Sequence, residues 1–361
     1  MSQTATPIRC LEFFSGIGGL HYALNIAKVN AQVVEAFDVN LIANKVYQHN
    51  FKHMPSKKTI DRLTAKEIDR YKATCWLLSP PCQPYTNGGH KKDTDDPRAK
   101  ALLHLIDLLP QLDVIPDYIF LENVKNFETS QSRKKLVEQL DTLGYEIKEY
   151  LLTPTQFGIP NNRMRYYLTA RKSKNYQNTT TNYIVTSKIQ TEWPFGNKQI
   201  KESELPPLSQ FLEEGNGDTE KLMVPERFIL RLYKFRLDIV QPTDKHTSCI
   251  TKAYGSHHIQ TSGSLVQTRD IECTNYNWDD TPSLLSFGLR FLSPTEISRL
   301  HAFPGPKYQL NNSNNEFFNP PTCSPHLEFP DDISQIQQYR LLGNSLNCWV
   351  VAELYRCLVF I

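Results

Sequence analysis

The sequence lacks several features that would assign it to a special class of protein. It has no run of roughly eighteen apolar residues such as a membrane helix needs, and its start, MSQTATPIRC, has no basic segment followed by an apolar one. Its eight cysteines include no Cys-x-x-Cys pair, which argues against a zinc ribbon, a thioredoxin-like site and a secreted disulfide framework. We therefore expect reduced thiols, no bound metal, and a protein of the cytoplasm or nucleus.

An excess of charge of one sign is lacking too. The chain has 40 basic and 38 acidic residues, a net charge of +2, which neither demands nor forbids a nucleic-acid partner. Hydrophobic residues make up 40% and charged residues 22% of the 361 positions, as in ordinary folded proteins. This composition excludes a disordered, collagen-like or coiled-coil chain and leaves room for one large domain or two smaller ones.

Short apolar runs alternate with amphipathic stretches in the first part of the chain. The runs that predict strands cover residues 9–14, 32–37, 74–78 and 118–121. Their alternation with helical patterns predicts an α/β fold with a doubly wound, mostly parallel sheet. A hairpin-like pair of strands, 145–152 and 165–170, is joined by the loop TPTQFGIPNNR, whose prolines and glycine prevent a continuous helix.

The composition then shifts toward Asn, Thr, Ser, Gln and Lys, from residue 171 to about residue 288. This shift predicts a smaller, irregular second domain, in which residues 224–239 are spaced like an amphipathic helix. Residues 310–330 are rich in Asn and Pro and predict a surface loop. Near the end, Asn344 or Ser345 is expected to cap a final helix. Its buried stripe is formed by Leu346, Val350, Leu354 and Leu358.

A glycine-rich segment, Phe14-Ser15-Gly16-Ile17-Gly18-Gly19, follows the first predicted strand. The third glycine of the dinucleotide fingerprint would fall at His21, so a pyrophosphate cradle is disfavoured and a nucleoside ligand without phosphates remains allowed. Asp38 ends the second strand, where a carboxylate can accept hydrogen bonds from ribose hydroxyls. A plain turn from strand to helix is the equally simple alternative.

Cys82 follows the third predicted strand within Ser-Pro-Pro-Cys-Gln-Pro, where prolines on both sides stiffen the loop and keep it out of a helix. Glu122 follows the fourth strand. Arg163 and Arg165 are two residues apart and thus on one face of a strand. The simpler alternatives are a buried cysteine that fills space, an acid at a helix N-terminus, and surface ion pairs.

Position links these residues, because Gly16, Asp38, Cys82 and Glu122 each follow a predicted parallel strand. Ligands of open α/β sheets bind outside the carboxyl ends of the strands. A cysteine nucleophile beside a carboxylic acid and a nucleoside-shaped site suits attack on C6 of cytosine. The acid then hydrogen-bonds N3, and C5 becomes nucleophilic enough to accept a methyl group.

Six segments, in this order, resemble the cytosine-C5 methyltransferases: FFSGIGGL (13–20), SPPCQPYT (79–86), LENV (121–124), IPNNRMRYYL (159–168), RFLSPTEISRLHAFP (290–304) and RLLGNSL (340–346). The resemblance implies an S-adenosylmethionine-dependent methyltransferase fold, with Cys82 as the nucleophile and Glu122 as the partner of N3. It also implies that Arg163 and Arg165 contact the cytosine. The residues that it assigns to S-adenosylmethionine are Ser15, Gly16, Ile17, Gly18, Asp38, Val39, Ile60, Asp61, Asn344 and Ser345.

The resemblance also divides the chain by function. Residues 1–188, completed by 320–361, correspond to the catalytic and cofactor-binding domain, and residues 189–319 to a target-recognition domain with a returning segment. In the second domain, the resemblance implies that Cys249, Thr251, Lys252 and Tyr254 face the nucleic acid. Further candidates for contacts to the nucleic acid are Lys91, Lys92, Arg133 to Lys135, Arg171, Lys172, Arg227, Arg231, Lys234, Arg236, His257 and His258.

Within the family, the segment CITKAYG (249–255) is similar to the eukaryotic branch that methylates tRNA-aspartate. That branch typically has Phe where this chain has Ile250, and many members of the family have Gln where it has Asn161. The expected partner is therefore tRNA, and the expected target is a cytosine in its anticodon loop. We expect the chain to act as a monomer and not to associate with a membrane. A DNA enzyme with the same chemistry and an inactive nucleic-acid-binding protein are the alternatives.

Overall fold

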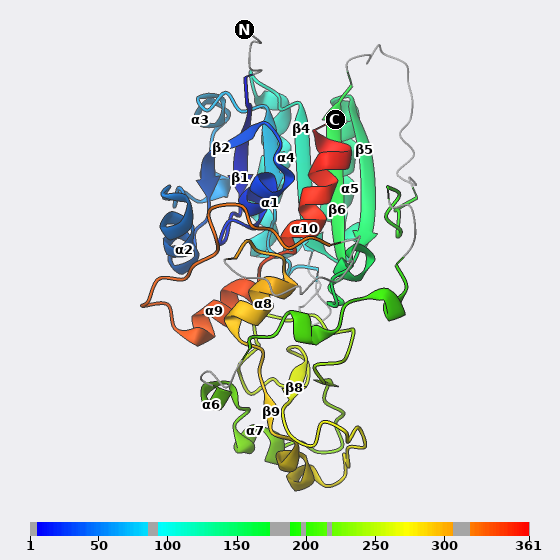
Figure 1. The fold of residues 1–361 in the computed structure, drawn as a ribbon. Coiled ribbons are helices and arrows are strands. Elements are labelled where there is room, and N and C mark those ends of the chain that lie inside the picture. The colour runs from blue at the N-terminus through cyan, green and yellow to red at the C-terminus, as the bar shows by residue number, and fades with distance from the viewer. Residues whose placement is uncertain are drawn as a thin grey trace. The chain divides into compact units, whose positions relative to one another are not determined.

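The computed structural model packs into two compact units (Figure 1). Unit 1 comprises Met1–Leu152, Met164–Asn197 and Val350–Ile361, and unit 2 comprises Thr153–Arg163 and Lys198–Trp349. The structure describes residues 6–85, 93–173, 188–195, 200–214, 219–305 and 318–360.

Unit 1 is built on a six-stranded sheet with the order β2-β1-β3-β4-β6-β5. Its strands are β1 (Ile8–Phe13), β2 (Ala31–Phe37), β3 (Cys75–Leu78), β4 (Tyr118–Val124), β5 (Tyr145–Leu152) and β6 (Arg165–Lys172). The first four run parallel, and β6 is antiparallel to both β4 and β5. All four residues of β3 are buried, as expected for an inner strand covered on both faces. The prediction of a mostly parallel, doubly wound α/β sheet is confirmed.

Helices cover both faces of this sheet. In Figure 1, α1 and α10 lie in front of the sheet and α4 and α5 behind it. The helices are α1 (Gly19–Ala27), α2 (Leu41–Phe51), α3 (Ala65–Asp69), α4 (Lys100–Leu108), α5 (Gln131–Thr142) and α10 (Cys348–Leu354), which continues as a π-helical turn over Tyr355–Val359. The turn packs on the sheet through Tyr355, whose ring meets the ring of Phe120 in β4 at 4.9 Å between centroids.

Unit 2 has little regular structure, as its composition predicts. Its sheet comprises β7 (Ile239–Val240), β8 (Leu265–Gln267) and β9 (Leu289–Arg290), and its helices are α6 (Thr219–Leu222), α7 (Glu226–Leu230), α8 (Pro294–Leu300) and α9 (Gln335–Gly343). The described part of the expected surface loop, residues 318–330, is irregular. Arg290 and Glu296 form a buried ion pair at 2.8 Å that joins β9 to α8.

Two helix predictions were wrong. The helix expected over 224–239 ends at Leu230, because Lys234 adopts a left-handed backbone (φ 50°) and the chain then enters β7. The final helix begins at Cys348, and Asn344 instead caps the C-terminus of α9. Asn347 Oδ1 accepts a hydrogen bond from Trp349 N (3.1 Å), which satisfies a backbone N–H of the first turn of α10. The predicted apolar stripe is nevertheless buried at all four positions.

Packing groups the chain differently from the functional division expected from the sequence. Residues 153–163 and 320–349 pack with unit 2, whereas the functional division places them in the catalytic domain. The functional boundaries stay a prediction. All eight cysteines lie in the described part of the chain, and none of them forms a disulfide. Among the described residues, no helix is long and apolar enough to cross a bilayer and no cluster of side chains could ligate a metal.

A carboxyl group is fully buried within β1. Glu12 accepts hydrogen bonds from the backbone N–H of His21 (3.2 Å) and from the hydroxyl of Tyr47 (2.8 Å). Burial raises the pKa of Glu12 to about 8, and burial lowers the pKa of the neighbouring His21 to about 3. The folded protein therefore holds a proton on Glu12 that the unfolded chain releases at much lower pH.

This proton makes stability depend on pH. Because the pKa of Glu12 is raised on folding, its contribution is complete below about pH 4.5 and is lost as the pH rises to about 8. We expect Glu12→Gln to remove this loss, so that the variant gains a few kcal/mol on the wild type between pH 5 and pH 8. Urea unfolding at several pH values measures the difference. Parallel stability curves would contradict the assignment.

Candidate active site

The carboxyl ends of the four parallel strands meet at one edge of the sheet. Phe13 pairs with Phe37 and Leu78, and Leu78 pairs with Leu121, so the segments after these strands start at the same level. The convergence predicted from the sequence therefore holds within unit 1. One detail was wrong: Glu122 lies inside β4 and not beyond it, because β4 continues to Val124 by pairing with β6.

The loop that carries Cys82 is tied to its neighbours by backbone contacts. Ser79 donates from its N–H to the carbonyl of Phe13 (3.3 Å) and from its hydroxyl to the carbonyl of Phe14 (3.1 Å). Asn123 in β4 donates to the carbonyl of Pro80 (3.2 Å). These bonds hold the loop to both adjacent strands, and they leave the cysteine partly exposed. Cys82 is therefore a held thiol and not a space-filling core residue.

Glu122 and Arg165 form an ion pair across β4 and β6. The distance from Arg165 Nε to Glu122 Oε1 is 3.5 Å, and the two side chains are only 13% and 11% exposed. Arg165 also donates to the carbonyl of Met164 (2.8 Å), which fixes its guanidinium. The low exposure of the pair strengthens each electrostatic interaction with a ligand at this edge.

A second arginine that the sequence did not single out lies near the cysteine. The guanidinium of Arg98 makes two hydrogen bonds to Asp96, at 2.8 and 2.6 Å, and Asp96 is itself buried. These bonds, and to a smaller extent the charge of Cys82, raise the pKa of Arg98. A guanidinium therefore lies within electrostatic range of Cys82. The motif Asp-Asp-Pro-Arg at 95–98 was the available signal, since an aspartate before proline caps a turn and holds the arginine.

The glycine-rich segment after β1 has open space where a ligand fits. Gly16 adopts a left-handed backbone (φ 52°), and a Cβ built on it would meet no atom within 4 Å. Its N–H donates to Asp38 Oδ2 (2.8 Å). The buried hydroxyl of Ser15 has no hydrogen-bond partner among the described residues. An open cradle beside an orphaned hydroxyl suits a polar ligand.

The other residues expected at this ligand differ in exposure. Asp38 Oδ1 also accepts from Asn40 N (2.8 Å), but each carboxylate oxygen keeps a second lone pair for a ribose hydroxyl. Burial raises the pKa of Asp38. Val39 is 61% exposed, so its apolar side chain is available to cover a ligand ring. Ile60 is buried and Asp61 is exposed.

Arg163 is positioned differently from Arg165. It is buried within unit 2, where its guanidinium donates to the carbonyl of Ile250 (2.9 Å), to Cys249 Sγ (3.3 Å) and to the carbonyl of Gly343 (3.3 Å). A further bond reaches the carbonyl of Ser345. This arginine therefore fastens the segment 249–255 to the end of α9. The two arginines, which the sequence treats as equivalent, face different surroundings.

Gly343, at the end of α9, also lets the segment 249–255 lie close to this helix. A Cβ at this position would lie 2.3 Å from the carbonyl carbon of Thr251 and 2.4 Å from the backbone nitrogen of Lys252. We expect Gly343→Ala to displace the segment 249–255 and to lower the free energy of unfolding by about 1–3 kcal/mol. Thermal unfolding measures the loss, with Arg340→Ala on the exposed face of α9 as the control. Equal melting temperatures of the two variants would contradict this packing.

Not all residues expected to face a nucleic acid are on the surface. Tyr254 is buried, donates to the carbonyl of Ser264 (2.7 Å) and accepts from Leu292 N (2.7 Å), so it is a core residue of unit 2. Lys252 is exposed. Ile250 and Asn161, the departures from the family pattern, are both completely buried.

The basic candidates also separate into several groups. Arg133 is buried against Glu149 and is not a surface cation. Arg227 and Arg231 lie over the ring of Phe228, at 5.4 and 5.2 Å. His257 and His258 are exposed, and their ring centroids lie 4.0 Å apart with the rings inclined at 38°. Lys91 and Lys92 lie outside the described residues.

The fold and the site of unit 1 define a methyltransferase of the S-adenosylmethionine-dependent class, and the comparisons specify which one. The family model of the C-5 cytosine-specific DNA methylases matches residues 8–358. The human tRNA (cytosine(38)-C(5))-methyltransferase is 35% identical over 98% of this chain and 99% of its own length. A Dictyostelium discoideum DNA (cytosine-5)-methyltransferase is 34% identical over 98% of this chain and 94% of its own.

A solved structure agrees with these relatives. The crystal structure of the S. pombe Dnmt2 methyltransferase matches with a TM-score of 0.76 and 34% identity, covering 97% of this chain and 98% of that one. The chain therefore belongs to the cytosine-C5 methyltransferase family, and the resemblance noted in its sequence is confirmed. S-adenosylmethionine is the methyl donor of this family and of this chain.

Proposed function

We propose that this protein methylates C5 of a cytosine in the anticodon loop of tRNA-aspartate, through a covalent bond between Cys82 and C6. The observation that carries the proposal is the placement of a held, partly exposed cysteine and a shielded Glu122–Arg165 pair at the carboxyl edge of one sheet. The names of the human and S. pombe relatives support tRNA and position 38 as the target. We place the reaction in the cytoplasm or nucleus.

In this mechanism the thiolate of Cys82 adds to C6 of the cytosine, and the electron pair of the C5–C6 double bond becomes available at C5. Glu122, in its protonated form, hydrogen-bonds N3 and transfers its proton there as negative charge develops on the ring. Arg165, which the family resemblance assigns to the cytosine, holds the carboxyl group in place. After C5 has gained the methyl group, a base takes the proton from C5, and the electron pair of that C–H bond restores the C5–C6 double bond and expels the thiolate.

When bound, S-adenosylmethionine supplies an electrophilic methyl group on a sulfonium sulfur. We assign its binding to the open cradle at Ser15, Gly16, Ile17 and Gly18. Asp38 takes the ribose, and Val39, Ile60 and Asp61 lie around the adenine. Asn344 and Ser345 complete the proposed set. Residues 189–319 form the proposed target-recognition domain, with Cys249, Thr251 and Lys252 toward the RNA.

The substrate is tested by transfer of a labelled methyl group to tRNA-aspartate and to genomic DNA. We expect label in the tRNA, and none in a transcript with uridine in place of cytosine 38. DNA is the second candidate, favoured by the name of the Dictyostelium discoideum relative. Label confined to DNA would overturn the tRNA assignment, and no label in either would favour an inactive binding protein.

A further inference from the structure

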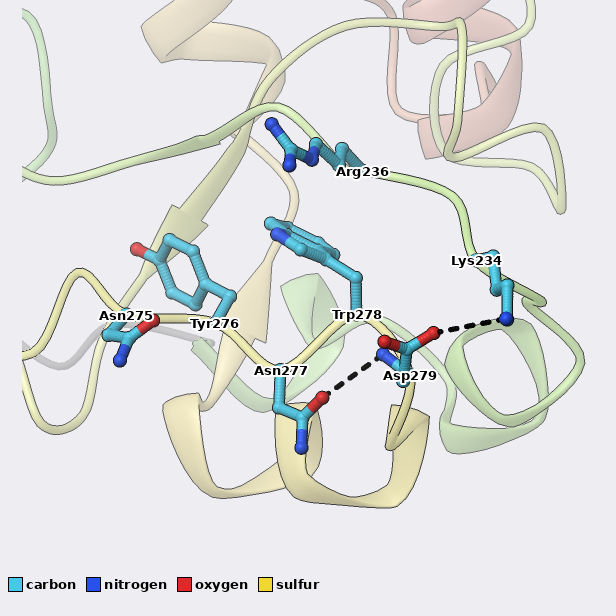
Figure 2. Close-up of a pocket in the computed structure, with 7 residues that line it drawn as sticks. All are labelled: Lys234, Arg236, Asn275, Tyr276, Asn277, Trp278 and Asp279. Atoms are coloured by element: carbon cyan, nitrogen blue, oxygen red, sulfur yellow. Dashed lines mark hydrogen bonds and ion pairs between the residues drawn. The ribbon is translucent and has the colours of Figure 1, made fainter.

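Unit 2 contains a pocket that the proposed reaction does not use (Figure 2). It has a volume of about 500 Å³ and is lined by Lys234, Arg236 and the five residues 275–279. Its size falls within the range of sites for small ligands, roughly 300–1,000 Å³. One wall is the segment that was wrongly predicted to continue as a helix, and the other is a loop rich in Asn and aromatic residues.

Two aromatic rings form the floor of this pocket. Tyr276 is fixed by a hydrogen bond from its hydroxyl to Gln267 Oε1 (2.6 Å) and by edge contact with Phe287 at 5.0 Å. Trp278 lies 5.4 Å from Tyr276, with the rings inclined at 54°. Both side chains are only partly buried, so ring surface remains available. A planar ligand could stack on these rings at little entropic cost, because Tyr276 is already held.

Positive charge lies beside the rings. Arg236 and Trp278 both line the pocket (Figure 2), and no carboxylate pairs with Arg236 among the residues that the structure describes. Lys234 lies 3.7 Å from Asp279, in a pair that is largely exposed and therefore weak. The pocket thus has two cations and one carboxylate. It is suited to a ligand with a flat ring and a negative group.

Aromatic and basic side chains also alternate in residues 233–236, which form one wall of the pocket and extend beyond it. Tyr233 is 81% exposed and Phe235 is 37% exposed, so they alternate with Lys234 and Arg236 along the chain. Exposed aromatic residues interleaved with basic ones are typical of surfaces that bind single-stranded nucleic acid by stacking and phosphate contacts. Two large aromatic side chains exposed so close together on one loop indicate a binding surface, because an ordinary solvated loop has no reason to expose them.

We propose that this pocket binds an unpaired nucleobase of the RNA substrate, other than the cytosine that is methylated. The base stacks on Trp278 and meets the ring of Tyr276 at its edge, since the two rings are inclined at 54°. Arg236 and Lys234 contact the phosphates that flank the base. The proposal rests on the proposed function, because it takes RNA to be the substrate. It adds a second anchor that fixes how the RNA lies on unit 2.

The experiment measures binding of the full-length protein to tRNA and to a short single-stranded RNA that contains 4-thiouridine. We expect ultraviolet light to cross-link the thiouridine to the peptide that contains residues 275–279. Trp278→Ala should weaken binding of either RNA by about 5- to 150-fold, the equivalent of 1–3 kcal/mol per stacked base. Trp278→Phe should keep most of the affinity because it keeps a ring.

Controls separate this site from a general loss of structure. Tyr71 is a partly exposed aromatic residue of unit 1 and lies outside residues 189–319, so Tyr71→Ala should leave RNA binding unchanged. If Trp278→Ala does not fold, the exposed Arg236→Glu provides the second variant, and it should weaken binding and reduce its salt dependence. Cross-links that lie elsewhere, or wild-type affinity in folded Trp278→Ala or Arg236→Glu, would overturn the proposal.

The assay distinguishes this proposal from the function on which it rests. Cross-linking and affinity need no methyl transfer, so a protein that binds RNA at residues 275–279 but methylates only DNA would disprove the tRNA reaction and keep the pocket. A protein that methylates tRNA and binds it equally well without Trp278 would keep the reaction and disprove the pocket.

Discussion

Cys82→Ala is expected to lower the rate of methyl transfer by at least about 10⁴-fold, because the proposed reaction has no route to a nucleophilic C5 without addition at C6. The hydrogen bonds from the side chains of Ser79 and Asn123 to backbone carbonyls hold the loop without the thiol, so the variant should fold normally. The measurement is single-turnover methyl transfer at saturating RNA. It separates the chemical step from binding, which should change little.

A matched cysteine provides the control. Cys357 is also partly exposed and lies in unit 1, in the π-helical turn after α10, so Cys357→Ala should keep full activity. RNA that contains 5-fluorocytidine gives an independent measurement, since fluorine at C5 cannot leave as a proton and the covalent adduct persists. We expect the adduct in the wild type and in Cys357→Ala, and none in Cys82→Ala. An adduct on any other cysteine would refute the assignment of the nucleophile.

Glu122→Gln is expected to reduce methyl transfer by about 10²- to 10⁴-fold, since the amide cannot protonate N3 as charge develops on the ring. The substitution keeps the shape of the side chain and a hydrogen-bonding group beside Arg165. Adduct formation with 5-fluorocytidine RNA should slow by a similar factor, because the defect lies in addition at C6. A merely structural role would instead lower RNA affinity or the melting temperature and leave this rate unchanged.

A second glutamate on the same sheet serves as the control for this substitution. Glu146 in β5 pairs with Lys148 on the surface, at 3.0 Å, and Glu146→Gln should be fully active. Normal single-turnover rates in Glu122→Gln would show that the carboxyl group does not act on the base. The chemistry at the carboxyl edge would then need a different acid.

The sheet of unit 1 could be predicted because its strands are short apolar runs separated by helical patterns. The register of those strands brings Gly16, Asp38 and Cys82 to one edge, as parallel topology requires. This part of the site depends on local sequence and on one topological rule. It is therefore the part that sequence reasoning recovers.

Contacts between segments distant in sequence were not predictable in this way. Arg163 and Arg165 look equivalent, but one is surrounded by carbonyls of unit 2 and the other pairs with Glu122. The interaction of Arg98 with Cys82 depends on how a turn folds back toward the cysteine loop. Tyr254 was expected to face the nucleic acid, but it is buried in the core of unit 2, where its hydroxyl makes two hydrogen bonds. In each case tertiary packing decided the role.

Unit 1 is built from segments at both ends of the chain, so it cannot finish folding until the last segment, Val350–Ile361, has been synthesised. The turn after α10 closes unit 1 by packing Tyr355 against Phe120, and Arg356 bonds to the carbonyl of Ala27 at 3.3 Å. These partners are more than two hundred residues apart in the sequence. The part of the sheet that the last segment covers, beside α1, therefore stays exposed while all of unit 2 is translated. Nascent chains stalled before residue 350 should therefore be recognised by chaperones, and a supplied peptide of residues 348–360 should release them.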